Sequence, residues 1–199
     1  MKGRTGCVIA VVAAVVVVGL YMVGLYNGLV GAEQQVEQSW AQVQNTYQRR
    51  ADLIPNLVAT VKGSAAFERE TLQQVVEARS RVGQVSAGAT AEILDDPQRF
   101  AQFQAAQDQL SSALSRLLVV VERYPELRSV ANFTNLMVQL EGTENRITVE
   151  RRRYNESAQA YNTRVLRLPA RLFAGVMGFE KKAYFTAVPG AETAPRVNF

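Results

Sequence analysis

Histidine is absent from this chain of 199 residues, and cysteine occurs once, at Cys7. Without these side chains the sequence cannot build the usual zinc ligand sets, a Ser-His-Asp triad, a Cys-His dyad or an internal disulfide. Ser64 and Thr71 have no base at a recognisable spacing, and Cys7 lies at the edge of an apolar segment. We therefore expect no catalytic residue, no metal site and no cofactor, and a protein that is not an enzyme.

Aromatic residues are also scarce, at 8%, and no large excess of charge is present. The formal net charge is +4, but Lys2 and Arg4 precede the apolar segment, so the rest keeps 20 basic against 18 acidic side chains, a net +2. This balance argues against a nucleic-acid partner. With 48% hydrophobic residues, the chain suits one helical domain plus a targeting segment.

An uncharged run from Val8 to Tyr26 is built mainly from Val, Ala, Leu, Ile, Met and Gly. Its length suits a helix that crosses a bilayer, so we predict a transmembrane helix over residues 8–30 after a short flank, 1–7. A cleaved signal peptide is the alternative, but its apolar region would be shorter, and no small-x-small cleavage site comes before Tyr21. The lipid bilayer is therefore an expected partner.

Charged residues flank this run unequally. Lys2, Arg4 and the α-amine precede it, whereas Glu33 and Glu37 follow it, and no basic residue comes until Arg49. Because basic flanks stay on the cytoplasmic side, we expect a single-pass protein of the cytoplasmic (inner) membrane with its N-terminus in the cytoplasm. The large C-terminal domain would then be periplasmic or extracellular.

Gly24 and Gly28 form a small-x-x-x-small pair inside the predicted transmembrane helix. Such spacing lets two membrane helices approach closely, which makes a homo-oligomer an expected state of the protein. An equally good interpretation is that glycine is simply common in membrane helices.

Apolar residues recur at alternating spacings of four and three from Val36 to Val82, as in a coiled coil or helical bundle. No strong breaker separates this stretch from the transmembrane segment, so we predict one helix running from the membrane to about Val82–Gly83. A loop is expected over Gly83–Ala91, which has turn residues and no periodicity.

Two more long helices are predicted after this loop. Asp96 is a good N-cap with Pro97 in the first turn, and Tyr124-Pro125 ends this second helix. The third begins near Pro125, and Pro169 closes it or begins a short fourth helix. The predicted fold is all-α: a transmembrane helix that continues into a long antiparallel bundle of three long helices plus a short C-terminal helix.

The bundle domain is expected to span residues 31–185. Its end is amphipathic, and five apolar side chains there are expected to cap the bundle: Leu172, Phe173, Val176, Met177 and Phe179. Residues 186–199 are rich in Pro, Ala and Thr and are expected to form a disordered tail.

Some positions on the predicted inward face are polar: Arg50, Glu68, Arg79, Gln107, Glu144 and Arg151. A buried charge costs several kcal/mol unless it is paired and hydrogen-bonded, so we predict ion pairs between helices. Arg50 with Glu144, and Arg79 with an acceptor on the second helix, are the pairings proposed. The alternative, a carboxylate cluster for a metal ion, would use Glu68, Glu141, Glu144 and Asp52; di-iron bundles need histidines that this chain lacks.

Other polar residues are interpreted structurally. Pro55 should remove one backbone hydrogen bond inside the first helix and bend it or open a local gap, which Asn56 could fill. Tyr154-Asn155 and Tyr161-Asn162 lie seven residues apart, which places both tyrosines on the inward face with both asparagines beside it. The basic run at 151–153 is favoured as a solvated helix face over a nucleic-acid or lipid patch.

Two sequence blocks resemble the LemA family: RRADLIPNLV at 49–58 and QLEGTENRI at 139–147. The resemblance extends from Tyr26 to Phe185 and implies a single-pass membrane protein with a helical domain beside the membrane, in a family without an agreed biochemical activity. One departure is Phe67-Glu68, where many relatives have His-Glu; it favours a structural part for Glu68. The blocks add six residues to those expected to hold one helix arrangement rather than a ligand: Asp52, Pro55, Asn56, Glu141, Asn145 and Arg146.

By the same resemblance, some relatives are genetically associated with a membrane metalloprotease, and one takes part in forming magnetosome membranes. We therefore expect a membrane-anchored scaffold that self-associates through its helical domain and organises or shapes the envelope membrane. The alternative is a monomeric adaptor that binds an envelope protein such as a membrane metalloprotease.

Overall fold

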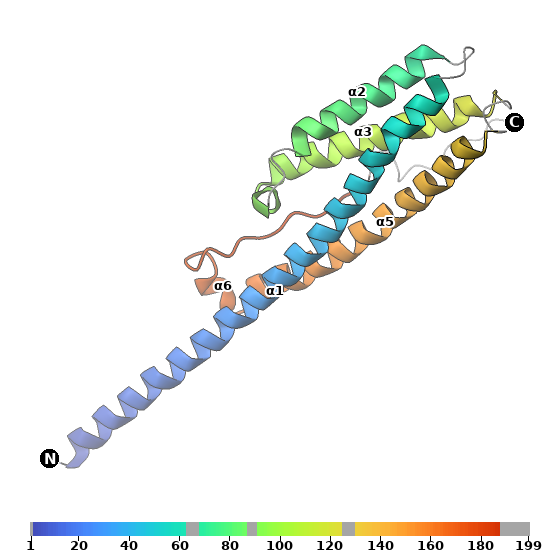
Figure 1. Ribbon diagram of the computed structural model, residues 1–199. Coiled ribbons are helices and arrows are strands. Elements are labelled where there is room, and N and C mark those ends of the chain that lie inside the picture. The colour runs from blue at the N-terminus through green and yellow to red at the C-terminus, as the bar shows by residue number, and fades with distance from the viewer. Residues whose placement is uncertain (1, 63–67, 87–90, 125–129, 188–199) are drawn as a thin grey trace, which may run out of the picture.

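The computed structural model describes residues 2–62, 68–86, 91–124 and 130–187, and these residues form helices and no strand. They comprise α1 (Lys2–Lys62), α2 (Arg69–Ser86), the 3-10 helix η1 (Ala91–Leu94), α3 (Pro97–Val121), α5 (Ala131–Leu166) and α6 (Ala170–Phe173). Figure 1 shows an elongated bundle from which the N-terminal part of α1 projects alone. The all-α fold predicted from the sequence is confirmed.

Helix α1 is continuous over 61 residues, which at 1.5 Å per residue corresponds to about 90 Å. Its N-terminal stretch is long and apolar enough to cross a membrane, and no other part of the described chain covers it. Pro55 lies inside α1, which stays helical on both sides. Asn56 is exposed, so it fills no gap inside the bundle.

The prediction that the first helix continues to Val82 is wrong. Helix α1 ends at Lys62, and α2 begins at Arg69 and runs back beside α3. Gly63, the residue after Lys62, is a weak helix former. After the reversal, the apolar face of α2 is buried against α3 instead of extending the rod.

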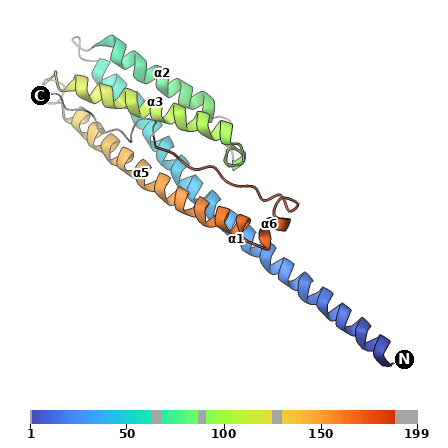
Figure 2. The ribbon, with the colours of Figure 1, turned by 180° about the vertical axis from the view of Figure 1, so that it is seen from behind.

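The helices form two antiparallel pairs, α1 with α5 and α2 with α3, and Figures 1 and 2 show the pairs lying against each other. Asp96 caps α3 as predicted: its Oδ1 accepts hydrogen bonds from the backbone N–H groups of Gln98 at 2.9 Å and Arg99 at 3.1 Å. Helix α2 extends to Ser86, so the loop prediction is wrong for residues 83–86, and residues 87–90 lie outside the described part.

The interior consists of two apolar clusters. The proximal core, nearer the projecting part of α1, is rich in aromatic residues, among them Trp40, Tyr47, Phe100, Phe103, Tyr154, Tyr161, Phe179 and Phe185. The distal core is mainly aliphatic and includes Ile54, Leu57, Val61, Leu72, Val75, Leu110, Leu114, Leu117, Phe133 and Leu140. Helices α1, α3 and α5 contribute to both clusters.

The C-terminal segment 180–187 lies along α5. The side-chain amide of Asn162 accepts from the Lys182 N–H and donates to its carbonyl, both at 2.9 Å. Asn155 holds Phe185 through the same two bonds, also at 2.9 Å. The asparagines seven residues apart therefore fix an extended segment to the helix. Thr186, where the tail was predicted to begin, hydrogen-bonds to Gln104, and residues 188–199 lie outside the described part.

Candidate functional site

Arg50 is fully buried at the boundary between the two cores. The heptad of α1 places it one turn beyond Tyr47 and one turn before Ile54, so its side chain points at α3 and α5. Nη1 donates to Ser111 Oγ at 2.7 Å and to Glu144 Oε1 at 2.8 Å. One guanidinium group thus connects three helices.

The other acceptors around Arg50 belong to α3. Nη2 donates to the side-chain oxygen of Gln107 and to its carbonyl oxygen. Ser111 Oγ in turn donates to Glu144 Oε2 at 3.2 Å, so the carboxylate receives bonds from both partners. The planar fork of arginine suits such multiple recognition, and pairing offsets the cost of burying the charge.

A second arginine, Arg151 on α5, lies one layer nearer the anchor. Its Nη2 donates to Asp108 at 2.7 Å, and its Nε donates to the Tyr47 hydroxyl at 2.6 Å. Arg50 and Arg151 both lie over the Tyr47 ring, at 5.1 and 5.6 Å from its centroid. Burial raises the pKa of Tyr47, although Arg151 acts in the opposite direction. Tyr47 is therefore a neutral phenol at physiological pH.

The polar layer, defined here as Arg50, Tyr47, Gln107, Asp108, Ser111, Glu144 and Arg151, separates the two cores. Most of its hydrogen bonds and ion pairs join one helix to another. These pairs fix the register between the helices, because a shift of one helix by a turn would leave several charges unpaired.

The Arg50–Glu144 pair proposed from the sequence is present at 2.8 Å. Arg79 has a different partner from the one proposed: its Nε donates to the carbonyl of Ala51 on α1 at 3.2 Å, and the side chain is exposed. Glu68 is exposed as well, with Arg123 Nη1 at 3.9 Å. Their expected inward placement is wrong: Leu72, Val75 and Val82 of the same repeat are buried, whereas Glu68 and Arg79 are exposed at the edge of that buried face.

The six residues that the two sequence blocks added to the predicted set are all exposed. Asp52 accepts from Gln48 Nε2 at 2.8 Å, and Arg146 pairs with Glu150 at 3.0 Å. The other exposed members are Pro55, Asn56, Glu141 and Asn145. The structure does not bring Glu68, Glu141, Glu144 and Asp52 together, and no group of three Asp, Glu or Cys side chains suited to a metal occurs among the described residues.

Several polar residues of the interior were not identified from the sequence, among them Asp108, Ser111, Glu150 and Lys182. Glu150 is buried at 2% exposure and pairs with Arg146 and Arg153. Asp108 and Ser111 lie beside and one turn after Gln107, so a search for partners of the seam charges on the second helix could have found them. Lys182 lies outside any periodic pattern, and no sequence signal indicated it.

Lys182 forms a second buried ion cluster at the proximal end. Its Nζ lies 2.8 Å from Glu33 on α1 and 2.5 Å from Asp95 after η1. Burial works to lower the pKa of Lys182, but the bonds to Asp95 and Glu33 outweigh it, and the pKa is raised. The lysine therefore stays charged and joins the C-terminal segment to the base of the bundle.

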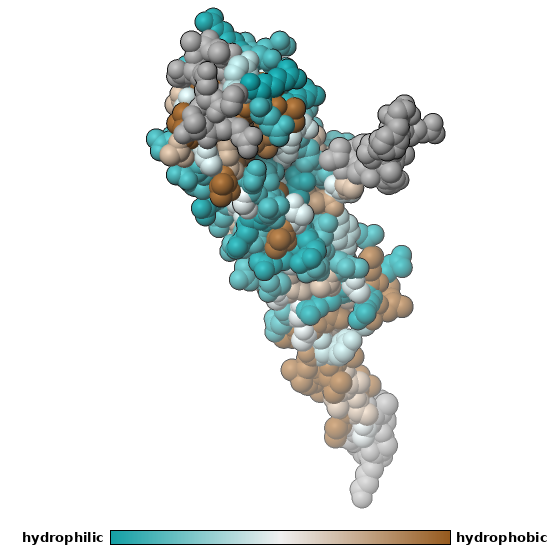
Figure 3. Space-filling model, turned by 90° about the vertical axis from the view of Figure 1, so that its right-hand side faces the viewer, coloured by the Kyte–Doolittle hydropathy of each residue, from teal (hydrophilic) through white to brown (hydrophobic). Residues whose placement is uncertain are grey.

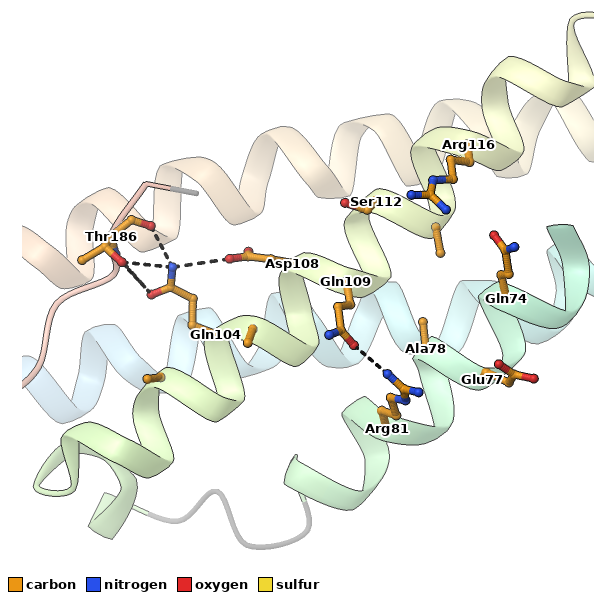
Figure 4. Close-up of a pocket in the computed structure, with 13 residues that line it drawn as sticks. Gln74, Glu77, Ala78, Arg81, Gln104, Asp108, Gln109, Ser112, Arg116 and Thr186 are labelled. Atoms are coloured by element: carbon orange, nitrogen blue, oxygen red, sulfur yellow. Dashed lines mark hydrogen bonds between the residues drawn. The ribbon is translucent and has the colours of Figure 1, made fainter. Parts of the chain in front are cut away.

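An open pocket of about 650 Å³ lies between α2 and α3 (Figure 4). Its lining combines polar side chains with four alanines; Gln74, Glu77, Arg81, Gln104, Asp108 and Arg116 are among the polar residues. Arg81 bridges the two helices by donating to Gln109 at 3.2 Å, and Thr186 closes one end through Gln104.

Gly24 and Gly28 lie on the projecting part of α1. A Cβ atom built at either glycine would meet no atom of the described chain within 4 Å. Packing inside this chain therefore does not require glycine at these two positions.

A family model matches residues 39–199; it describes the LemA family. Magnetosome protein MamQ 2 of Paramagnetospirillum magneticum is 27% identical over 182 residues, covering 84% of this chain and 67% of the relative. Magnetosome protein MamQ of Magnetospirillum gryphiswaldense is 26% identical with the same coverage. Protein LemA of Metamycoplasma hominis is 21% identical over 143 residues, covering 72% of this chain and 60% of the relative.

Proposed function

The chain belongs to the LemA family, and on this premise we propose that it is a membrane-anchored, non-enzymatic scaffold that self-associates and organises or shapes the envelope membrane. The likeness to magnetosome proteins supports a role at a membrane compartment. The apolar N-terminal helix supports a single membrane span.

One observation carries this proposal: α1 is uninterrupted from the apolar stretch into the bundle. The same helix supplies Arg50 to the polar layer and Leu57 to the distal core. Because no linker intervenes, the orientation of the domain is set by the orientation of the helix in the bilayer. Copies that pack side by side would therefore impose a common geometry on the membrane.

Self-association is supported by the open face at Gly24 and Gly28. Glycine lets helices approach closely in a bilayer, where packing rather than the hydrophobic effect drives association. Neither glycine has a packing role within the described chain, which leaves contact with a second copy as a reason for both. The homo-oligomer is part of the proposal.

The proposed location is the cytoplasmic membrane, with the N-terminus in the cytoplasm and the bundle in the periplasm or outside the cell. Lys2 and Arg4 precede the span and Glu33 and Glu37 follow it, which supports this orientation.

The second candidate function is a monomeric adaptor for an envelope protein such as a membrane metalloprotease. The pocket between α2 and α3 favours it, because its Gln, Arg and Glu side chains could bind polar groups of a partner. The pocket lies away from the anchor along the bundle, so it would be accessible in an oligomer as well as in a monomer.

The test is mass determination and electron microscopy of the full-length protein, extracted gently from its own membrane. The scaffold proposal predicts a defined oligomer with the anchors gathered on one side, and a smaller species for the double variant Gly24→Leu/Gly28→Leu. Gly19→Leu is the matched control, because Gly19 lies in the same apolar stretch but, at 100° per residue, on a different face. A monomeric wild type would favour the adaptor, whose partner crosslinking in cells would identify.

A further inference from the structure

Large apolar side chains are exposed around α6. Leu168, Leu172 and Val176 are 73%, 68% and 93% exposed, and Phe173 is 39% exposed. The prediction that this segment caps the bundle is wrong for Leu172, Phe173 and Val176, whereas Phe179 is buried as expected and Met177 packs against the proximal core. Single exposed apolar residues are ordinary on a protein surface, but a group of four within nine positions needs an explanation.

The orientation of α6 is the reverse of that in a soluble amphipathic helix. Such a helix turns its large apolar side chains to the core. Here the small side chains Ala170 and Ala174, one turn apart, are buried against the bundle, while Leu172 and Phe173 face outward. The bulky apolar groups of this segment therefore lie outside the bundle.

The segment lies at the level where α1 leaves its apolar stretch. The Phe179 ring contacts the Tyr26 ring at 5.5 Å between centroids, and Arg164 Nη1 donates to the carbonyl of Gly28 at 3.0 Å. A hydrocarbon core of about 30 Å takes about 20 helical residues, so a span that starts at Val8 reaches about Asn27. Figure 3 shows hydrophobic surface where the domain narrows into the anchor, including a patch to one side. The level of α6 is thus that of the lipid headgroups.

Charge around α6 has one predominant sign. Residues 164–181 contain four basic side chains and one acidic one, Glu180. Arg167 and Arg171 are exposed, so their guanidinium groups can reach lipid phosphates while the apolar neighbours enter the acyl boundary. Arg164 is exposed as well, but one of its nitrogens already donates to the Gly28 carbonyl. Basic residues near an anionic surface each add favourable binding energy.

We propose that residues 166–176 are a second membrane contact, a lipid-interface element whose apolar side chains insert among the headgroups of an anionic leaflet. This inference rests on the proposed anchoring of α1. The element would attach the base of the bundle to the bilayer beside the span, and two points of attachment would restrict the tilt of the rod.

The test places one environment-sensitive fluorophore on the full-length protein in vesicles of phosphatidylcholine and phosphatidylglycerol. In a Cys7→Ser background, single variants Val176→Cys, Val138→Cys and Val16→Cys carry the label; Val138 is 63% exposed on α5 far from the span, and Val16 lies in the anchor. Nitroxide lipids with the quencher near the headgroup or deep in the chain report depth. We expect shallow quenching and a blue shift at 176, deep quenching at 16, and neither at 138.

Each departure from this pattern has a separate meaning. Quenching at 16 without quenching at 176 would overturn the interface element and leave the anchor standing. Loss of quenching at both positions would overturn the anchoring proposal and this inference together. A blue shift at 176 that lipid nitroxides do not quench would show protein, such as a second copy, on this surface and would also overturn it. Arg167→Gln/Arg171→Gln should reduce the extra quenching that phosphatidylglycerol gives at 176.

Discussion

The proximal and distal cores are built from different side chains on the same helices. In the proximal core, Trp40 has the rings of Phe100, Phe103, Tyr154 and Phe185 within 5.2 to 6.1 Å between centroids. The distal core contains one aromatic side chain, Phe133, among the buried residues that the structure describes. The difference follows the helices that enclose each core: α1, α2, α3 and α5 all contribute buried residues to the distal core, whereas α2 contributes only the partly buried Val85 to the proximal one.

Rings and the C-terminal segment fill the place that a fourth helix occupies in the distal half. Phe185 comes from this segment, and its ring is 4.8 Å from that of Phe100 between centroids. An extended segment that carries one large ring can thus close the bundle if its backbone groups are hydrogen-bonded. Asn155 and Asn162 provide these hydrogen bonds.

Matched truncations would break the two cores separately. Phe100→Ala and Phe133→Ala remove the same side chain from two sites that are both 2% exposed. Each should lower the free energy of unfolding by about 3–5 kcal/mol. Phe100→Ala should cost more, because ring pairs add about 0.5–1.5 kcal/mol beyond burial. Denaturant unfolding followed by circular dichroism measures both; equal losses would contradict a special role for the aromatic cluster.

Uncoupling the polar layer tests the boundary between the cores. Arg50→Met leaves Gln107 and Glu144 without their shared donor, and should cost about 3 kcal/mol, the lower end for a broken buried pair because Glu144 is partly exposed. A double-mutant cycle with Glu144→Gln should give a coupling energy of about 1 kcal/mol or more. Arg79→Met, at an exposed position, is the control and should change stability by less than about 0.5 kcal/mol. Zero coupling would show that the Arg50–Glu144 pair does not fix the register between the helices.

Alkaline pH should loosen the proximal core first, since the buried tyrosines with raised pKa lie there. Burial raises the pKa of Tyr154, with Asp95 adding to it, and burial with Glu33 does the same for Tyr161. A tyrosine whose pKa is higher in the folded than in the unfolded protein stabilises the fold fully below the unfolded-state pKa of about 10. As the pH rises above 10, the free energy of unfolding falls by up to about 1.4 kcal/mol per pH unit for each such tyrosine.

Two phenylalanine variants sharpen this prediction. Tyr154→Phe loses the bond from the hydroxyl to the Ala183 carbonyl, 2.9 Å long, and should cost about 1 kcal/mol at pH 7. The Tyr161 hydroxyl is buried without a partner within the described chain, so Tyr161→Phe should be neutral or stabilising. In denaturant titrations at a series of pH values, the free energy of unfolding should fall less with pH above 10 for both variants than for the wild type. Identical losses at pH 7 would contradict the assigned hydrogen bonding.

Much of the helical architecture could be predicted from the sequence. The 4-3 spacing indicated the inward faces of α1, α3 and α5, and Asp96-Pro97 fixed the start of α3 because its cap is local chemistry. The reversal after Lys62 could not be predicted from periodicity, since the apolar repeat of α2 continues that of α1 in phase. Only the contact of α2 with α3 distinguishes a longer rod from a hairpin.

The polar layer was predictable where charge interrupted the heptad. Arg50 and Glu144 were paired because both occupy inward positions of facing helices. Lys182 was missed because its ion pairs depend on the path of an extended segment, which no repeat describes. Asn155 and Asn162 were noticed for their spacing, but their partners could not be predicted. These partners are backbone N–H and carbonyl groups, which every residue type except proline offers alike.

The continuity of α1 fixes a rotational phase between the anchor and the domain. Each helical residue advances about 100° around the axis. The direction in which Gly24 and Gly28 face is therefore locked to the directions in which Arg50 and Trp40 face. One alanine inserted after Gly24 would turn the domain by about 100° relative to the N-terminal part of the anchor. The number of residues between the anchor and the domain thus sets the direction in which the domain faces around the axis of α1.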